Sequence, residues 1–151
     1  MRPYSMTVFD RIYWAMIVIG LLGGAVNWQA AMTTMTTNPG LGMLGNGAVM
    51  GILIGSVLLG LVINVLLWYF ISRRVSNTAR WIWVVLAAIG LPGSLRIIFA
   101  GNTQITLPGA GRAIVAINIV LQIAAAVMLF RAESRAWFAR GGAAVDIDAF
   151  N

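Results

Sequence analysis

Four long apolar stretches, separated by short polar segments, divide the chain. They cover about residues 12–32, 48–71, 80–100 and 113–130. Each is close to the roughly 20 residues that an α-helix needs to cross about 30 Å of hydrocarbon. Helices are the expected form, because unpaired backbone groups are costly in lipid. The pattern predicts an all-α fold, a single membrane domain over 1–151 that is an integral bundle of four transmembrane helices.

The polar segments between the stretches predict the connections. The first, TTMTTNPGLGMLGNG, is uncharged and contains Pro39, so it cannot be one regular helix and we expect a loop. The turn before the third stretch offers three polar residues, 76–78, any of which could cap the next helix. Residues 131–140 carry Trp137 and Phe138 among arginines, which is typical of a short helix lying in the membrane interface.

The arginines predict the orientation. All ten basic residues are arginine, and eight of them fall within residues 1–11, 73–80 and 131–140. These three regions would lie on one side of a four-helix bundle, and positive loops favour the cytoplasm, so both termini are predicted to be cytoplasmic. The net charge of +6 then comes from arginines that orient the helices in the membrane, and we expect no nucleic-acid partner. Arginine-only usage in a chain rich in alanine and glycine suits a GC-rich bacterial genome, so we expect a multi-pass protein of the bacterial inner membrane.

The composition removes most kinds of catalysis. The chain has no cysteine and no histidine, which excludes disulfides, thiolate chemistry, zinc sites and His-ligated haem. It also removes the most frequent general base. No pair of carboxylates lies inside a stretch, and no phosphate-binding loop is evident. We therefore expect no catalytic residue, no metal site and no cofactor, and a protein that is not an enzyme.

Polar residues inside the apolar stretches form the candidate site. At a rise of about 1.5 Å per residue, Asn27, Arg96 and Asn118 fall at a similar depth in the outer third of the membrane. Gln122 lies one turn deeper than Asn118 on the same helix face. A guanidinium at this depth needs partners, and no acid lies near it in the sequence. Arg96 either reaches lipid phosphates while the amides bond between helices, or joins Asn27, Asn118 and Gln122 in a site for an anionic or polar ligand.

Small residues and one proline mark expected helix contacts. Two small-xxx-small patterns lie within the stretches, at Gly20 and Gly24 and at Gly51 and Gly55. Such patterns let helix backbones approach closely, either inside a bundle or between chains, and the first is the commoner use. Pro92 and Gly93 predict a kink in the third helix, because proline lacks an N–H and clashes with the preceding turn.

The C-terminal half resembles a loosely defined group of small, uncharacterised bacterial inner-membrane proteins. The similar parts are ARWIWVVLAAIGLPGSL and, after a short loop, LQIAAAVMLFRAESRAWF, of which LFR-x-x-x-R-A-W-F is the most specific. The resemblance implies four spans and a cytoplasmic C-terminus, but no activity.

These observations lead to three functional hypotheses. The first is a non-catalytic accessory or assembly subunit that lies in the lipid bilayer and packs against other membrane proteins or a second copy of itself. The second is a small transporter or channel with an anionic or polar site around Arg96. The third is a membrane immunity or stress protein.

Overall fold

The computed structural model describes residues 3–99 and 109–141, and the elements in these ranges are all α-helices. Four of them are long and apolar enough to span a membrane: α1 (Tyr4–Val26), α4 (Gly45–Ser72), α5 (Asn77–Phe99) and α6 (Gly109–Phe130). The shorter helices are α2 (Trp28–Thr36), α3 (Pro39–Gly42) and α7 (Ala132–Ala139). The predicted all-α architecture with four spanning helices is confirmed.

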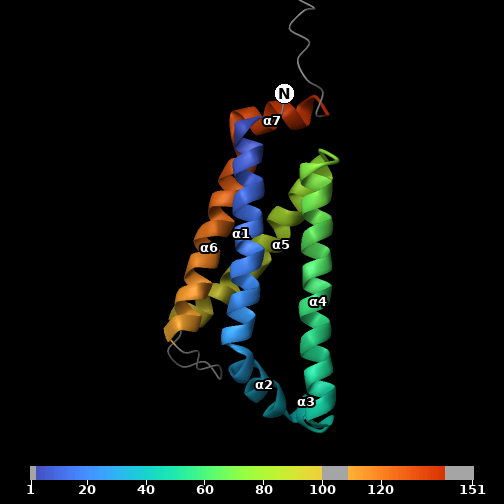
Figure 1. The fold of residues 1–151 in the computed structure, drawn as a ribbon, viewed down its shortest axis with the longest axis vertical. Coiled ribbons are helices and arrows are strands. Elements are labelled where there is room, and N and C mark those ends of the chain that lie inside the picture. The colour runs from blue at the N-terminus through green and yellow to red at the C-terminus, as the bar shows by residue number, and fades with distance from the viewer. Residues whose placement is uncertain (1–2, 100–108, 142–151) are drawn as a thin grey trace, which may run out of the picture.

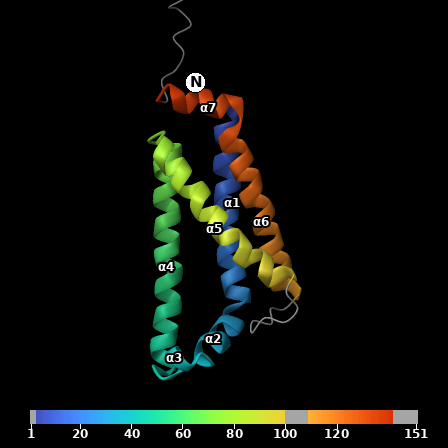
Figure 2. The ribbon, with the colours of Figure 1, turned by 180° about the vertical axis from the view of Figure 1, so that it is seen from behind.

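The long helices form an open bundle. Helices α1 and α6 lie side by side, while α4 stands apart from α6 (Figure 1). Helix α5 crosses obliquely, next to α4 at one end and next to α6 at the other (Figure 2). We call the end that holds Tyr4, the turn 73–76 and α7 the α7 end. The opposite end, which holds α2, α3 and Gly109, is the α3 end.

The tightest packing is at the α7 end. Its centre is formed by the rings of Phe9, Tyr13 and Trp83, whose centroids lie 5.4 to 6.3 Å apart. These rings belong to a larger cluster of buried side chains drawn from α1, α4, α5, α6 and α7. In contrast, only 6 to 28% of the residues in an apolar 18-residue segment of each spanning helix are buried. Most of the helix surface is therefore left to face lipid or another chain.

The first spanning helix differs from the predicted stretch at both limits. Helix α1 begins at Tyr4 rather than near residue 12, because Ser5, Met6 and Phe9 are fully buried under the α7 end. It ends at Val26, because the backbone of Asn27 departs from helical values with φ −95° and ψ 10°.

The segment expected to be an irregular loop is largely helical. In α2, the hydroxyls of Thr33, Thr34 and Thr36 donate to carbonyls three or four residues earlier, at 2.8 to 3.1 Å. Asn38 caps α3, where its Oδ1 accepts from the N–H of Gly40 at 3.0 Å with Pro39 at the first helical position. This polar segment can be helical because its side chains find hydrogen-bond partners on its own backbone.

The other connections follow the sequence more closely. Ser76 is the residue that caps α5, since its Oγ accepts from the N–H of Ala79 at 3.2 Å. Helix α5 continues as one helix through Pro92 and Gly93, and both residues are exposed. The proline expected to kink this helix therefore does not interrupt it. Helix α7 lies across the end of the bundle, as an interfacial helix would (Figure 1).

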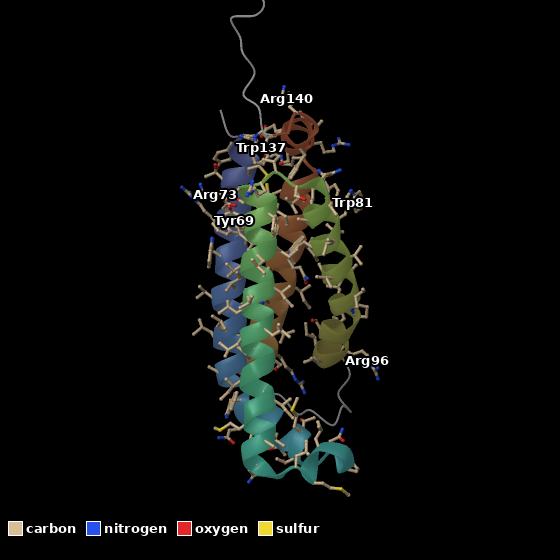
Figure 3. All side chains as sticks on the ribbon, turned by 90° about the vertical axis from the view of Figure 1, so that its right-hand side faces the viewer. Tyr69, Arg73, Trp81, Arg96, Trp137 and Arg140 are labelled. Carbon is tan, nitrogen blue, oxygen red and sulfur yellow. The ribbon has the colours of Figure 1, made fainter. Side chains whose placement is uncertain are left out.

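The three arginine-rich regions meet at the α7 end. The hydroxyls of Ser134 in α7 and Ser5 in α1 are hydrogen-bonded to each other, with Oγ to Oγ at 2.9 Å. Arg73, Trp81, Trp137 and Arg140 gather at this end, far from Arg96 (Figure 3). This arrangement agrees with the prediction that the three regions share one side of the membrane.

Candidate binding site

The α1–α6 pair is built from small residues that face larger ones. The contacts pair Gly20 with Asn118, Gly23 with Ile114, and Gly111 with Asn27. A Cβ added to Gly20 would lie 3.2 Å from Asn118 Nδ2, and one added to Gly23 would lie 2.8 Å from Ile114 Cγ2. These glycines therefore let the two antiparallel helices approach closely and bring the amide of Asn118 against α1.

Only one of the four predicted packing glycines has this role. Gly20 lies in the α1–α6 contact, but a Cβ on Gly24, Gly51 or Gly55 would meet nothing within 4 Å. The packing predicted for these three inside the bundle is therefore not present. Gly23, which the small-xxx-small pattern does not include, makes the contact instead of Gly24. Gly20, Gly23 and Asn27 lie on the same face of α1, and this is the face that contacts α6.

Next to Gly20, the four spanning helices surround a cavity of about 360 Å³. A second cavity of about 370 Å³ shares part of its lining and extends toward Asn27 and Ala31 at the α3 end. The residues common to both are Gly20, Ser94, Asn118 and Gln122. We treat the two as one space, the amide cavity, whose polar lining consists of Asn27, Asn64, Ser94, Asn118 and Gln122.

The ring cluster lies at the inner limit of the amide cavity. A smaller cavity of about 180 Å³ beside Asn64 and Gln122 reaches Trp83. There Tyr13 donates from its hydroxyl to the backbone oxygen of Asn64 at 3.0 Å and to Asn64 Oδ1 at 3.2 Å. The cavity is thus backed by packed rings toward the α7 end, and its lining continues toward the α3 end.

The amides of the cavity differ in how fully they are hydrogen-bonded. Asn64 is satisfied, because its Nδ2 also donates to the Gly60 oxygen at 2.9 Å. Asn118 Nδ2 makes only a long bond of 3.4 Å to the Met16 oxygen. Asn27 Oδ1 is buried without a partner. Within the described part of the chain, no hydrogen bond joins the Gln122 side chain to another residue. An unpaired amide in an apolar environment costs about 1–3 kcal/mol, so the cavity favours a polar occupant.

Arg96 does not share this space with the amides. Its side chain is exposed, lines neither part of the amide cavity, and points away from the bundle (Figure 3). Helix α5 instead turns Ser94 and Ile97 toward the cavity. The structure thus places Asn27, Asn118 and Gln122 in the lining of one cavity but leaves out the predicted cation. Asn27, opposite Gly111, lies about 10 Å nearer the α3 end than Asn118, opposite Gly20, so the similar depth expected for them is not found. The exposed position of Arg96 is the one expected of an arginine whose side chain extends to lipid phosphates.

Two polar lining residues lie outside the predicted site. They are Ser94 and Asn64, each a polar residue within an apolar stretch, and this position was the feature of the sequence that could have identified them.

Among residues 3–99 and 109–141, no three acidic side chains come together as a metal site would require. The cavity offers amide groups and a hydroxyl, which can bind ligands through hydrogen bonds but do not ionise near neutral pH. No family model matches the chain, and no curated protein and no solved structure is similar to it.

Proposed function

We propose that this chain is a small, non-catalytic membrane protein that binds a small solute in the amide cavity and conducts it across the bilayer. One observation carries the proposal: polar side chains from α4, α5, α6 and the junction of α1 and α2 converge on one space inside an apolar bundle. Polar groups within membrane spans are costly to maintain and typically mark the path of a substrate or ion. Pockets between the helices of a bundle are frequent ligand sites.

The shape of the cavity supports the same proposal. The lining continues toward the α3 end, while Tyr13 and Trp83 back the space toward the α7 end. A site that is backed by packed side chains toward one face of the membrane and extends toward the other fits alternating access. On the charge distribution, we place the α7 end in the cytoplasm of a bacterium, and the cavity then extends toward the outer face.

Solute flux into liposomes tests the proposal. The purified chain is reconstituted, and the uptake of a panel of small neutral and ionic solutes is compared with that of empty liposomes. We expect at least one solute to enter faster, and Gln122→Met to reduce this flux at least tenfold by removing the amide. The matched control is Val120→Met on the exposed face of the same helix, which should leave the flux within twofold. Uptake equal to that of empty liposomes for every solute would overturn the proposal.

A second candidate function is the accessory subunit, and a different observation favours it. Gly51 and Gly55 lie one helical turn apart on α4, are exposed, and have no neighbouring element within reach of a Cβ. Exposed glycines at this spacing suit the close approach of another transmembrane helix. This candidate needs a second chain on the surface of α4, whereas the first uses the interior of the bundle.

Mass measurement under mild conditions distinguishes the accessory role. The tagged chain is extracted from its native membrane in a mild detergent, and the mass of the particle is measured. A complex with another chain or a second copy supports the role, provided that Gly51→Leu dissociates it and Gly90→Leu, at an exposed glycine of α5, does not. A monomer without any other protein argues against it.

A further inference from the structure

We infer, resting on the proposed function, that the solute of the amide cavity is small, electrically neutral and rich in groups that both donate and accept hydrogen bonds, such as hydroxyls and amides. Three properties of the described cavity lead to this class of ligand: the absence of charge from its lining, its free hydrogen-bond donors and acceptors, and its volume.

The lining of the cavity contains no charged side chain. The arginines described near the α3 end, Arg96 and Arg112, are both exposed and lie outside it. An ion that entered would lose its hydration and find only amide and hydroxyl dipoles in a low-dielectric environment, where an uncompensated charge is strongly disfavoured. A neutral solute instead exchanges its hydrogen bonds with water for bonds with the amides, at little net change.

Both donors and acceptors are left free in the cavity. The side-chain amide of Gln122, which makes no hydrogen bond to a described residue, offers two N–H groups and an oxygen. Ser94 already donates its hydroxyl hydrogen to the Gly90 oxygen at 3.2 Å, which leaves only its lone pairs. Asn118 Nδ2 is engaged with the Met16 oxygen, while no described residue donates to its Oδ1. Free donors together with free acceptors call for a ligand that carries both kinds of group, as a polyol or a urea does.

The volume of the cavity sets the size of the ligand. Each part measures about 360 to 370 Å³, far above the roughly 10–15 Å³ that one water requires. Several waters or one small organic molecule therefore fit, and the polar lining gives water the partners that it needs to enter. Glycerol and urea are suitable probes of this class.

Single-cysteine labelling tests the class independently of transport. The chain has no cysteine, so Gln122→Cys provides a unique thiol in the cavity. Three methanethiosulfonates of similar size are compared: a neutral hydroxyethyl reagent, a cationic trimethylammonioethyl reagent and an anionic sulfonatoethyl reagent. Each rate is divided by the rate at Asn46→Cys, an exposed position at the α3 end. Val120→Cys reports reaction from the lipid at a similar depth, and Ser94→Cys is a second, near-isosteric cavity position.

We expect the neutral reagent to react at Gln122→Cys and Ser94→Cys at least tenfold faster than either charged reagent, in these normalised rates. Glycerol or urea should slow this reaction at least twofold without slowing it at Asn46→Cys, because the solute occupies the cavity. Charged reagents that react as fast as the neutral one would overturn the neutral class while leaving a hydrated cavity and the proposed function in place. Cavity thiols as unreactive as Val120→Cys would mean that no solute or water enters, and both proposals would fail.

Discussion

At the scale of single residues, the contact between Gly111 and Asn27 determines how α6 meets the junction of α1 and α2. A Cβ on Gly111 would overlap the side-chain amide of Asn27. We expect Gly111→Ala to destabilise the protein by about 1–3 kcal/mol, as overpacking does. Gly51→Ala should instead be neutral or stabilise by up to about 1 kcal/mol, because it meets no other group and favours the helix. Thermal unfolding in detergent measures both.

The cause of the Gly111 effect can be separated from a general loss of helix packing. If the overlap with Asn27 is responsible, Asn27→Ala should recover most of the stability that Gly111→Ala removes, because the two residues are in direct contact. Losses that simply add in the double variant would contradict the assignment of this contact.

Arg80 is a second residue with a measurable role. It is 7% exposed, and its Nε and Nη1 are buried without hydrogen-bond partners. Its guanidinium carbon lies 4.8 Å from the centroid of the Phe138 ring and 5.1 Å from that of Phe130. Ring faces attract a desolvated cation by about 2 kcal/mol, so these contacts offset the missing hydrogen bonds.

A double-mutant cycle measures the contact between Arg80 and Phe138. We expect Phe138→Leu to lower the free energy of unfolding by about 0.5–2 kcal/mol more in the native protein than in the Arg80→Met variant. Only in the native protein does this substitution remove a cation–ring contact. Chemical unfolding of the four variants gives the coupling energy. Equal costs in both backgrounds would mean that Phe138 acts through apolar packing alone.

At the scale of elements, α7 is docked by one buried polar contact as well as by its aromatic residues. Ser134 Oγ lies 2.9 Å from Ser5 Oγ and 2.7 Å from the Met128 oxygen, and both serines are fully buried. Ser134→Ala leaves the Ser5 hydroxyl without this partner, at a cost of about 1–3 kcal/mol. We expect hydrogen exchange of the α7 amides to accelerate at least fivefold, whereas Arg135→Lys, an exposed change on the same helix that keeps the charge, should leave it unchanged.

The elements also show which parts of the fold the sequence could predict. The spanning helices α4, α5 and α6 lie close to the predicted stretches because apolar length alone determines a transmembrane helix. Helix α2 was missed because threonine and glycine composition indicates a loop, while its hydroxyls in fact bond within the helix. Helix α1 begins before the apolar stretch 12–32 because its charged part also packs in the bundle, where Trp68 Nε1 donates to Asp10 Oδ1 at 3.0 Å.

At the scale of the whole molecule, the candidate site illustrates a different limit. Counting residues gives the depth of a side chain only when the limits of its helix are known. Because α1 begins at Tyr4 and ends at Val26, Asn27 lies level with Gly111, while Asn118 lies level with Gly20, about 10 Å nearer the α7 end, so the similar depth expected for the two is wrong. The direction in which each helix turns its side chains depends on which neighbours it packs against. Helix α5 crosses from α4 to α6, and this oblique path brings Ser94 to the cavity and leaves Arg96 outside (Figure 2). No pattern within α5 alone contains that information.

The orientation of the molecule in the membrane follows from its charge asymmetry and can be measured. Exposed arginines gather at the α7 end, among them Arg73, Arg74, Arg131, Arg135 and Arg140, whereas Arg96 and Arg112 lie nearer the α3 end. Because arginine is retained on the cytoplasmic side during insertion, we expect the α3 end to be external. In right-side-out vesicles of the expressing cells, an impermeant maleimide should label Asn46→Cys directly but should label Ala136→Cys, an exposed position of α7, only after permeabilisation. The opposite pattern would reverse the orientation, and the amide cavity would then extend toward the cytoplasm rather than toward the outer face.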